Sequence, residues 1–313
     1  MTSKNGEEGV IQHLIKGKNL GIVSMDTGEM IASYEGGVRV QTEAEIESSK
    51  KYYESIKPLD QKYGRISSLY EKRGTFIWNI HSSAQILFPE IKPATLTRLM
   101  FLSTYLGYDG YLVDSKKNPI TKNNLQHYLA IHPSDCRKFW KDIDASKLMY
   151  ENDGKIYLDA KMFTRGKFPR DKIKDLAENE QYLTRIYIAG VRALYNTATV
   201  PSHTTLSYIF RILPYVNKEY NVCCFNPLET DKSKIELMSL GDFADVVGYD
   251  RAHISRLAKT LFEPIFEVNG TLKNAIRYVS TNGFNKDGLS MFINPFVYYA
   301  GTHWNEVEIL GCF

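Results

Sequence analysis

Residues Ser239–Phe262, SLGDFADVVGYDRAHISRLAKTLF, have the pattern of two short amphipathic helices. Ser239 is a suitable N-cap, and Asp242 places a carboxylate in the first turn of a short helix. Gly248 ends that helix, because glycine readily adopts the left-handed conformation, and Asp250 caps a second helix. Two helices joined by a tight turn indicate a helix-turn-helix. The side chains predicted to face inward are Leu240, Phe243, Val246, Val247, Ile254, Leu257 and Leu261.

The outer face of the second helix is polar and basic, with Arg251, Ser255, Arg256 and Lys259. An arginine can donate two hydrogen bonds to one guanine, so Arg256 is a candidate for base recognition, with Arg251 and Ser255 in support. Lys259 is better suited to phosphate contact. The alternative interpretation is an ordinary helical hairpin whose charges are solvated.

The composition is that of a soluble globular protein of two or three domains: 313 residues, 43% hydrophobic and 24% charged. The net charge is only +3, so any DNA-binding charge must be local. The four cysteines lack the spacing of zinc ligands. The polar start, MTSKNGEEG, leads us to expect no signal peptide, and no apolar run approaches the ~20 residues that span a membrane. We therefore expect a cytoplasmic protein without metal or cofactor.

An earlier part of the chain repeats the pattern at a shift of 118 residues, which carries Thr121, the predicted cap of a first helix, onto Ser239. The same shift places Lys138 on Arg256 and Lys141 on Lys259, so both second helices carry two outward basic residues. The matched non-polar pairs are Leu125 with Phe243, Leu129 with Val247, Ile131 with Tyr249, Cys136 with Ile254, Phe139 with Leu257 and Ile143 with Leu261.

The first repeat continues into a β-hairpin, which Asn152-Asp153-Gly154 predicts between two short apolar segments. Helices followed by such a hairpin form a winged helix. A second match, at a shift of 135, pairs Ile156–Phe163 with Met291–Tyr298. We interpret the chain as tandem winged-helix modules. The further candidates for DNA contact are Ser134, Arg137, Lys138 and Lys141 in the first module, with Arg137 reading bases, and Lys273 and Arg277 in the second wing.

The predicted fold class is α+β, with tandem winged helix-turn-helix modules and a small β-rich N-terminal portion. The portions are residues 1–92, module one at 93–167, a linker at 168–181 and module two at 182–313. Strands are expected at Asn19–Met25 and Met30–Tyr34, after a frayed N-terminus. A long helix from Asp171 or Asn179 to Tyr195 is expected to open module two.

The closing stretch Ile293-Asn294-Pro295-Phe296-Val297-Tyr298-Tyr299-Ala300-Gly301 resembles the "INPxxYYxG" strand of winged-helix DNA-binding proteins from phages and plasmids of Gram-positive bacteria, replication initiators among them. Residues 213–221 and 226–230 resemble the same group, and the likeness is strongest over 183–304. In the first module Asp159-Ala160 replaces Asn-Pro, and the wing is short and acidic. The resemblance implies DNA binding more firmly than any one biological role.

No catalytic motif is present: there is no Gly-rich phosphate loop, G-x-S-x-G or H-E-x-x-H. Tyr298 could act as a nucleophile in a nicking enzyme, but a packing role is favoured. We therefore predict a non-enzymatic protein that binds specific double-stranded DNA, as an origin-binding initiator or as a phage transcriptional regulator. A protein-interaction role for the winged helices is the third alternative. Homodimerisation and contacts with host replication or transcription proteins stay open, and no membrane partner is expected.

Overall fold

The computed structural model describes residues 12–16, 19–23, 30–35, 74–166, 183–262, 264–268, 271–281, 288–299 and 301. The fold is mixed α+β, as predicted, with small antiparallel sheets. The chain divides into two compact units, Met1–Lys62 and Tyr63–Phe313, a division that differs from the predicted portions. The predicted linker at 168–181 lies outside the described residues.

The N-terminal unit contains a three-stranded antiparallel sheet in the order β1-β2-β3. Its strands are β1 (Gln12–Lys16), β2 (Asn19–Val23) and β3 (Met30–Glu35). The strands predicted from Asn19 and from Met30 are thus confirmed. The frayed segment predicted up to residue 15 is wrong from Gln12 onward, because β1 pairs along its whole length with β2, from Gln12↔Val23 to Lys16↔Asn19.

The larger unit is built on a four-stranded antiparallel sheet in the order β13-β8-β4-β7. Its strands are β4 (Phe76–Ile80), β7 (Phe163–Thr164), β8 (Leu183–Tyr187) and β13 (Tyr298–Tyr299). The long helix predicted up to Tyr195 is wrong in its first part. Leu183–Tyr187 is a central strand with neighbours on both sides, in keeping with its buried β-branched and aromatic side chains, and α7 (Ile188–Thr197) follows it.

The pairing in this sheet is symmetric about the contact between β4 and β8. The central residue pair of these two antiparallel strands is Trp78↔Arg185. Strand β7 places Phe163 and Thr164 beside β4, and β13 places Tyr298 and Tyr299 beside β8 in the corresponding register. Phe163 and Tyr298 are 135 residues apart, the shift of the second sequence match, so the matched closing segments occupy corresponding positions on opposite edges of one sheet.

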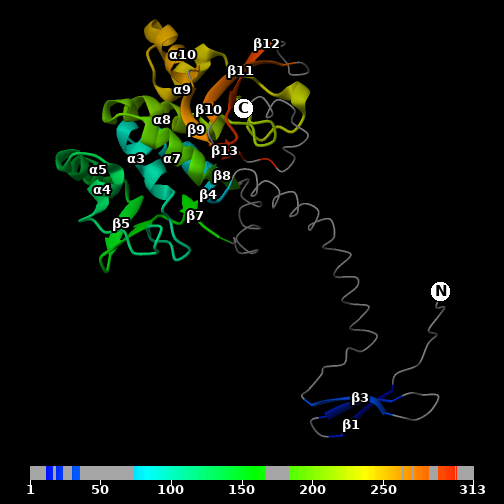
Figure 1. The fold of residues 1–313 in the computed structure, drawn as a ribbon. Helices are drawn as coiled ribbons and strands as arrows, with labels where there is room; N and C mark the ends of the chain where they lie inside the picture. The colour runs from blue at the N-terminus through cyan, green and yellow to red at the C-terminus, as the bar shows by residue number, and fades with distance from the viewer. Residues whose placement is uncertain are drawn as a thin grey trace. The chain divides into compact units, whose positions relative to one another are not determined.

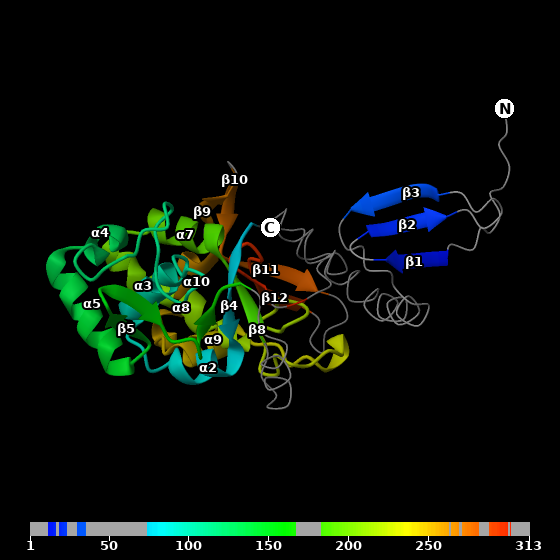
Figure 2. The same ribbon diagram turned by 90° about the horizontal axis from the view of Figure 1, so that it is seen from below.

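The helices of the larger unit share one hydrophobic core. Helix α3 packs against α8, and this pair lies in the middle of the unit (Figure 1). Figure 1 shows α4 and α5 at one end of this unit and α9 and α10 at the other, and Figure 2 shows the same helices after a quarter turn. The α-helices are α2 (His81–Leu87), α3 (Pro93–Ser103), α4 (Leu125–Leu129), α5 (Pro133–Ser146), α7, α8 (His203–Arg211), α9 (Leu240–Val247) and α10 (Ile254–Phe262); the 3₁₀ turns are η1 (Val200–Ser202), η2 (Leu213–Tyr215), η3 (Lys232–Lys234) and η4 (Arg251–His253).

A β-hairpin follows α5, and another follows α10. In the first hairpin the turn residues Asp153 and Gly154 have φ angles of 48° and 71°, as the Asn-Asp-Gly sequence predicts for a tight primed turn. A further hairpin follows β10. The strands are β5 (Met149–Asn152), β6 (Lys155–Leu158), β9 (Pro264–Val268), β10 (Thr271–Asn274), β11 (Ile276–Thr281) and β12 (Gly288–Ile293).

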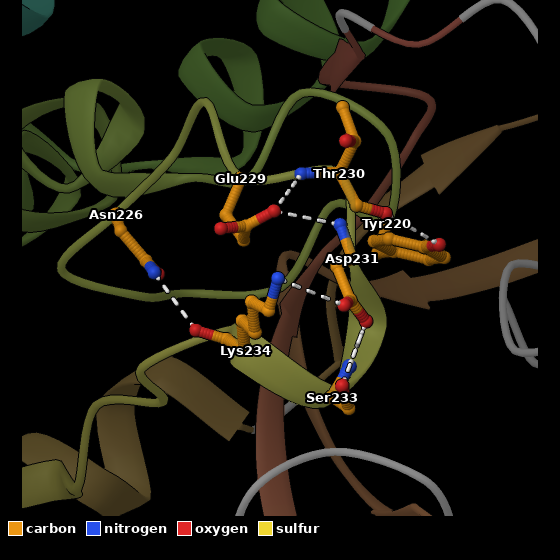
Figure 3. A network of polar contacts seen from close by, with 7 residues as sticks. All are labelled: Tyr220, Asn226, Glu229, Thr230, Asp231, Ser233 and Lys234. Atoms are coloured by element: carbon orange, nitrogen blue, oxygen red, sulfur yellow. Dashed lines mark hydrogen bonds and ion pairs between the residues drawn. The ribbon is translucent and has the colours of Figure 1, made fainter.

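The loop before α9 is ordered by its own polar side chains (Figure 3). The Glu229 carboxylate accepts hydrogen bonds of 2.8 Å from the backbone N–H groups of Thr230 and Asp231. Asp231 in turn accepts from the backbone of Ser233 at 3.0 Å and pairs with Lys234 at 3.5 Å. A surface loop with little apolar content is held in one shape by such local bonds. None of the helices in the described residues has the length and apolar character needed to cross a membrane.

Burial lowers the pKa of two histidines in this unit, His81 and His203, and His203 is expected to make its stability depend on pH. The His203 side chain is 2% exposed, and burial lowers its pKa from 6.5 to about 4, with the nearby Arg98 charge acting in the same direction. Between those pH values the unfolded chain binds a proton that the folded chain does not. We therefore expect the free energy of unfolding to fall on acidification from pH 6.5 towards pH 4, by up to ~1.4 kcal/mol per pH unit.

Urea unfolding at pH 7, 6 and 5 measures this dependence. His203→Gln is the control, because glutamine does not titrate. This variant should be less sensitive to acidification than the natural chain. If the free energy of unfolding changed equally with pH in both proteins, a group other than His203 would be responsible for the pH dependence.

Candidate nucleic-acid interface

The two helices of the second predicted helix-turn-helix, α9 and α10, form, with η4 between them. Ser239 and Asp242 make a reciprocal capping box: the Ser239 hydroxyl accepts from the Asp242 N–H at 3.2 Å, and the Asp242 carboxylate accepts from the Ser239 N–H at 2.8 Å. Gly248 ends α9 in the left-handed conformation, with φ 71°. Asp250 then caps the next turn by accepting from the Ala252 N–H at 2.9 Å.

The first helix-turn-helix, α4 with α5, has the same turn at a shift of 118 residues. Ala130 corresponds to Gly248 and is also left-handed, with φ 49°. His132 corresponds to Asp250 and accepts from the Ser134 N–H at 3.3 Å. The predicted cap at Thr121 is wrong, because α4 begins at Leu125. What remains of the capping box is one bond of 2.8 Å, from the Thr121 backbone N–H to the Asn124 side chain.

The apolar faces predicted for the two pairs of helices lie in the core. Ile131 and Tyr249 occupy the corresponding turn positions, the first buried and the second half-buried. The Tyr249 ring meets the Tyr208 ring of α8 edge-on at 5.3 Å between centroids. The predicted inward residues that are 0–1% exposed are Leu125, Leu129, Phe139, Ile143, Phe243, Val247, Leu257 and Leu261; Leu240, Val246, Ile254 and Cys136 are half-buried.

Two side chains from other helices fix the ends of α4 and α9. Tyr195 of α7 donates its hydroxyl to the Leu129 carbonyl at 2.8 Å. Arg211 of α8 donates to the corresponding Val247 carbonyl at 2.9 Å. These bonds satisfy carbonyls that a helix end leaves without an intrahelical partner. Neither positioning residue is predicted from the sequence, because neither has a local signal that links it to the helix it supports.

In the first module the predicted contact residues lie on the outer side of α5. Arg137, Lys138 and Lys141 are exposed, and Lys138 pairs with Asp135 at 3.5 Å. Ser134 is half-buried, and its hydroxyl is 2.8 Å from Nδ1 of His132. The structure thus leaves the three basic side chains facing solvent and holds Ser134 at the helix start.

In the second module Ser255, Arg256 and Lys259 are exposed on α10. Arg251 is engaged within its own helix-turn-helix: its Nε donates to Asp245 at 2.7 Å, and Nη2 also contacts Asp245. A hydrogen bond from Arg251, and then its charge, lower the pKa of Asp245. Arg251 thus forms a bridge that ties η4 back to α9, and its supporting role in base recognition stays a prediction.

The two predicted wing residues lie at the base of the second hairpin. Lys273 is half-buried, with its nitrogen 5.2 Å from the centroid of the Phe296 ring. Arg277 is exposed on β11, and its Nε donates to Asn274 at 3.3 Å. Lys273 on β10 thus lies against the segment between β12 and β13, and Arg277 contacts the last residue of β10. DNA contact by these two side chains stays a prediction.

The two second helices differ in their balance of charge. The α5 sequence, PSDCRKFWKDIDAS, carries three basic and three acidic residues. The segment Arg251–Phe262, RAHISRLAKTLF, carries three basic residues and no acidic one. Because a phosphate backbone attracts positive and repels negative side chains, α10 is electrostatically better suited to nucleic acid than α5. Comparison with protein-family models, curated proteins and solved structures gave no match to this chain.

The corresponding left-handed residues at the two turns allow a paired test. Ala130→Gly should raise the free energy of unfolding by up to ~1 kcal/mol, because glycine lacks the Cβ that is strained in this conformation. Gly248→Ala should lower it by about 1 kcal/mol. A Cβ at Gly248 would meet only the Arg211 Nη1 at an ordinary 3.6 Å, so backbone strain alone is tested. Urea unfolding measures both, and changes of the same sign would contradict the shared turn geometry.

Proposed function

We propose that the chain binds a specific double-stranded DNA site through tandem winged-helix modules, as an origin-binding replication initiator of a phage or plasmid. The observation that carries the proposal is the pair of helix-turn-helix segments with one turn geometry. The left-handed turn residues, the caps at the start of the second helices and the buried positions recur at the same shift. Basic residues at corresponding outer positions, Lys138 with Arg256 and Lys141 with Lys259, are exposed.

The proposed contacts follow from side-chain chemistry. Arg256 and Arg137 read guanines in successive major grooves, since a guanidinium donates two bonds to O6 and N7. Lys138, Lys141 and Lys259 contact phosphate and set the salt dependence. Two modules in one chain reach two half-sites about one helical turn apart, on the order of 10 bp. The resemblance of the Ile293–Gly301 stretch to phage and plasmid DNA-binding proteins supports DNA binding, and a transcriptional regulator would use the same contacts.

Selection from a random duplex library and from fragments of the source genome tests the proposal. We expect enrichment of one sequence, present as repeats beside an AT-rich region. Sites over promoters would support the transcriptional regulator instead. If no duplex is enriched at low salt, the DNA-binding proposal fails.

One observation favours a protein-interaction role for the first module. Glu151 and Asp153 are exposed at its hairpin, where negative charge opposes approach to phosphate. Tyr150, 47% exposed, stacks on Tyr157 at 5.4 Å and presents an aromatic surface beside them. If Glu151→Gln together with Asp153→Asn leaves DNA affinity unchanged and abolishes binding to a replication or transcription protein, this module serves a protein partner.

A further inference from the structure

A cleft of about 500 Å³ lies in the larger unit, away from the proposed DNA contacts. It forms where the chain after α3, the segment after β7 and helix α7 meet. Its volume falls in the range of small-molecule sites, roughly 300–1,000 Å³. None of the ten residues predicted to contact DNA lines it. The lining residues that matter here are Tyr108, Asp109, Asp114, Arg165 and Arg192.

Two arginines line the cleft with only neutral acceptors as partners. Arg165 donates from Nη1 to the Leu106 carbonyl at 2.7 Å. Arg192 donates to the Thr104 hydroxyl at 2.9 Å and to the Thr104 carbonyl at 3.0 Å. Among the described residues no carboxylate forms an ion pair with either one. A guanidinium has five N–H groups, so both retain donors beyond these bonds.

Aromatic rings hold the two guanidinium groups in place. Arg192 lies over the Tyr105 ring, with 4.1 Å to the centroid, and Arg165 lies over the Tyr108 ring at 5.1 Å. Burial lowers the pKa of Arg192, with Tyr105 opposing and the Arg165 charge reinforcing that effect. Two neighbouring cations, both of them half-buried, would each be stabilised by a shared anion.

The acidic residues of the lining do not supply that anion. Asp114 accepts from the backbone N–H groups of Lys116 and Asn118, each at 2.8 Å, and so completes its own loop. Asp109 is exposed at the rim. Tyr108, at 76% exposed, lies beside it and offers a ring to an incoming ligand.

We propose that this cleft binds a phosphate-bearing small molecule of the nucleotide class, with Arg165 and Arg192 on the phosphate and Tyr108 against the base. Arginine is the preferred partner of phosphate, because its planar fork matches two phosphate oxygens. A tyrosine ring stacks on a nucleobase without requiring a particular sequence. The site is independent of the proposed DNA contacts.

Isothermal titration of the full chain in a phosphate-free buffer tests this, with inorganic phosphate, AMP and ATP as probes. We expect the nucleotides to bind more tightly than inorganic phosphate. Arg165→Gln and Arg192→Gln should each weaken binding about tenfold or more, since each removes charged hydrogen bonds. Arg137→Gln, on α5, is the matched control and should bind the nucleotides as the natural chain does.

Arg192→Gln removes bonds to Thr104, so a second variant covers the case in which it does not fold. Tyr108→Ala alters an exposed ring and should weaken nucleotide binding more than phosphate binding. Equal affinity for phosphate and nucleotides would still support a phosphate site, without recognition of the base. No binding of any probe at millimolar concentration would overturn the proposal. Loss of DNA affinity in Arg165→Gln without small-anion binding would also overturn it, and would make the cleft a backbone contact.

Discussion

Arg256→Ala is expected to weaken binding to the selected DNA site by about 10- to 100-fold, which corresponds to the roughly 1–3 kcal/mol of a bidentate base contact. Arg256 is exposed in a segment, Arg251–Phe262, that contains no carboxylate. No residue in the described part of the chain forms an ion pair with it. The base preference at one position of each site should also relax, because the lost bonds carry sequence information.

The companion variants separate base reading from charge. Arg137→Ala should cost less, about two- to fivefold, because three carboxylates on α5 already weaken its attraction for DNA. Lys259→Ala should weaken all duplexes alike and reduce the salt slope by about one. Lys234→Ala is the control: it also removes one positive charge, from an exposed side chain of the loop in Figure 3, and should change neither affinity nor specificity.

Fluorescence anisotropy at two salt concentrations, with the selected duplex and a scrambled one, measures all four. Unchanged affinity and specificity in both Arg256→Ala and Arg137→Ala would make the residue assignments wrong, even if the protein binds DNA. A loss in Lys234→Ala as large as in Arg256→Ala would show that net charge, rather than the α10 surface, governs binding.

The turns of the two helix-turn-helix segments could be predicted because their signals are local. Gly248, Asp250 and Ser239 act within three or four residues of their own positions, and the structure confirms each of them. The cap at Thr121 failed on the side of the threonine. The Asn124 side chain accepts from the Thr121 N–H as Asp242 does from the Ser239 N–H, but the Asn124 N–H bonds to the Thr121 carbonyl at 3.2 Å rather than to its hydroxyl, and α4 begins at Leu125.

The closing segments show what a sequence match at a fixed shift can predict. Asn294 accepts from the Phe296 N–H at 2.9 Å, and Asp159, 135 residues earlier, accepts from the Lys161 N–H at 2.8 Å. The carbonyl groups of Asn294 and Asp159 also accept from the residues three and four positions later. Asp and Asn therefore form the same turn with a side-chain oxygen, while Asn294 in addition donates its amide to the Asn274 carbonyl at 2.7 Å, a bond that a carboxylate could not make.

The four-stranded sheet and the cleft could not be predicted in the same way, because their contacts are long-range. Trp78 pairs with Arg185, and Arg192 bonds to Thr104, 88 residues away. Strand β8 follows a polar segment whose helical periodicity suggested one long helix. Its extended conformation depends on strands at both edges, β4 and β13, and neither is near in sequence. Local propensity gives no information about such partners.

Gly190→Ala is expected to lower the free energy of unfolding by about 3 kcal/mol or more, which is the upper part of the range for overpacking. A Cβ on this residue of α7 would lie 1.9 Å from the Phe296 carbonyl oxygen and 2.7 Å from its carbon. Hydrogen bonds of the neighbouring residues prevent the Phe296 backbone from moving away from the new Cβ. Tyr187 donates its N–H to the Val297 carbonyl at 3.0 Å, and β13 pairs with β8 immediately afterwards. Relief of the clash would break these bonds.

The matched control is Gly241→Ala, the same substitution in α9. There the new Cβ would meet the guanidinium carbon of Arg251 at 3.3 Å, and a flexible, exposed side chain can move aside. Helix propensity then dominates, so this variant should be more stable by up to ~1 kcal/mol. Urea unfolding of both variants tests for opposite signs. If Gly190→Ala were as stable as the natural chain, α7 would not pack directly on the turn before β13, and the contact that closes the second half of the sheet would be wrong.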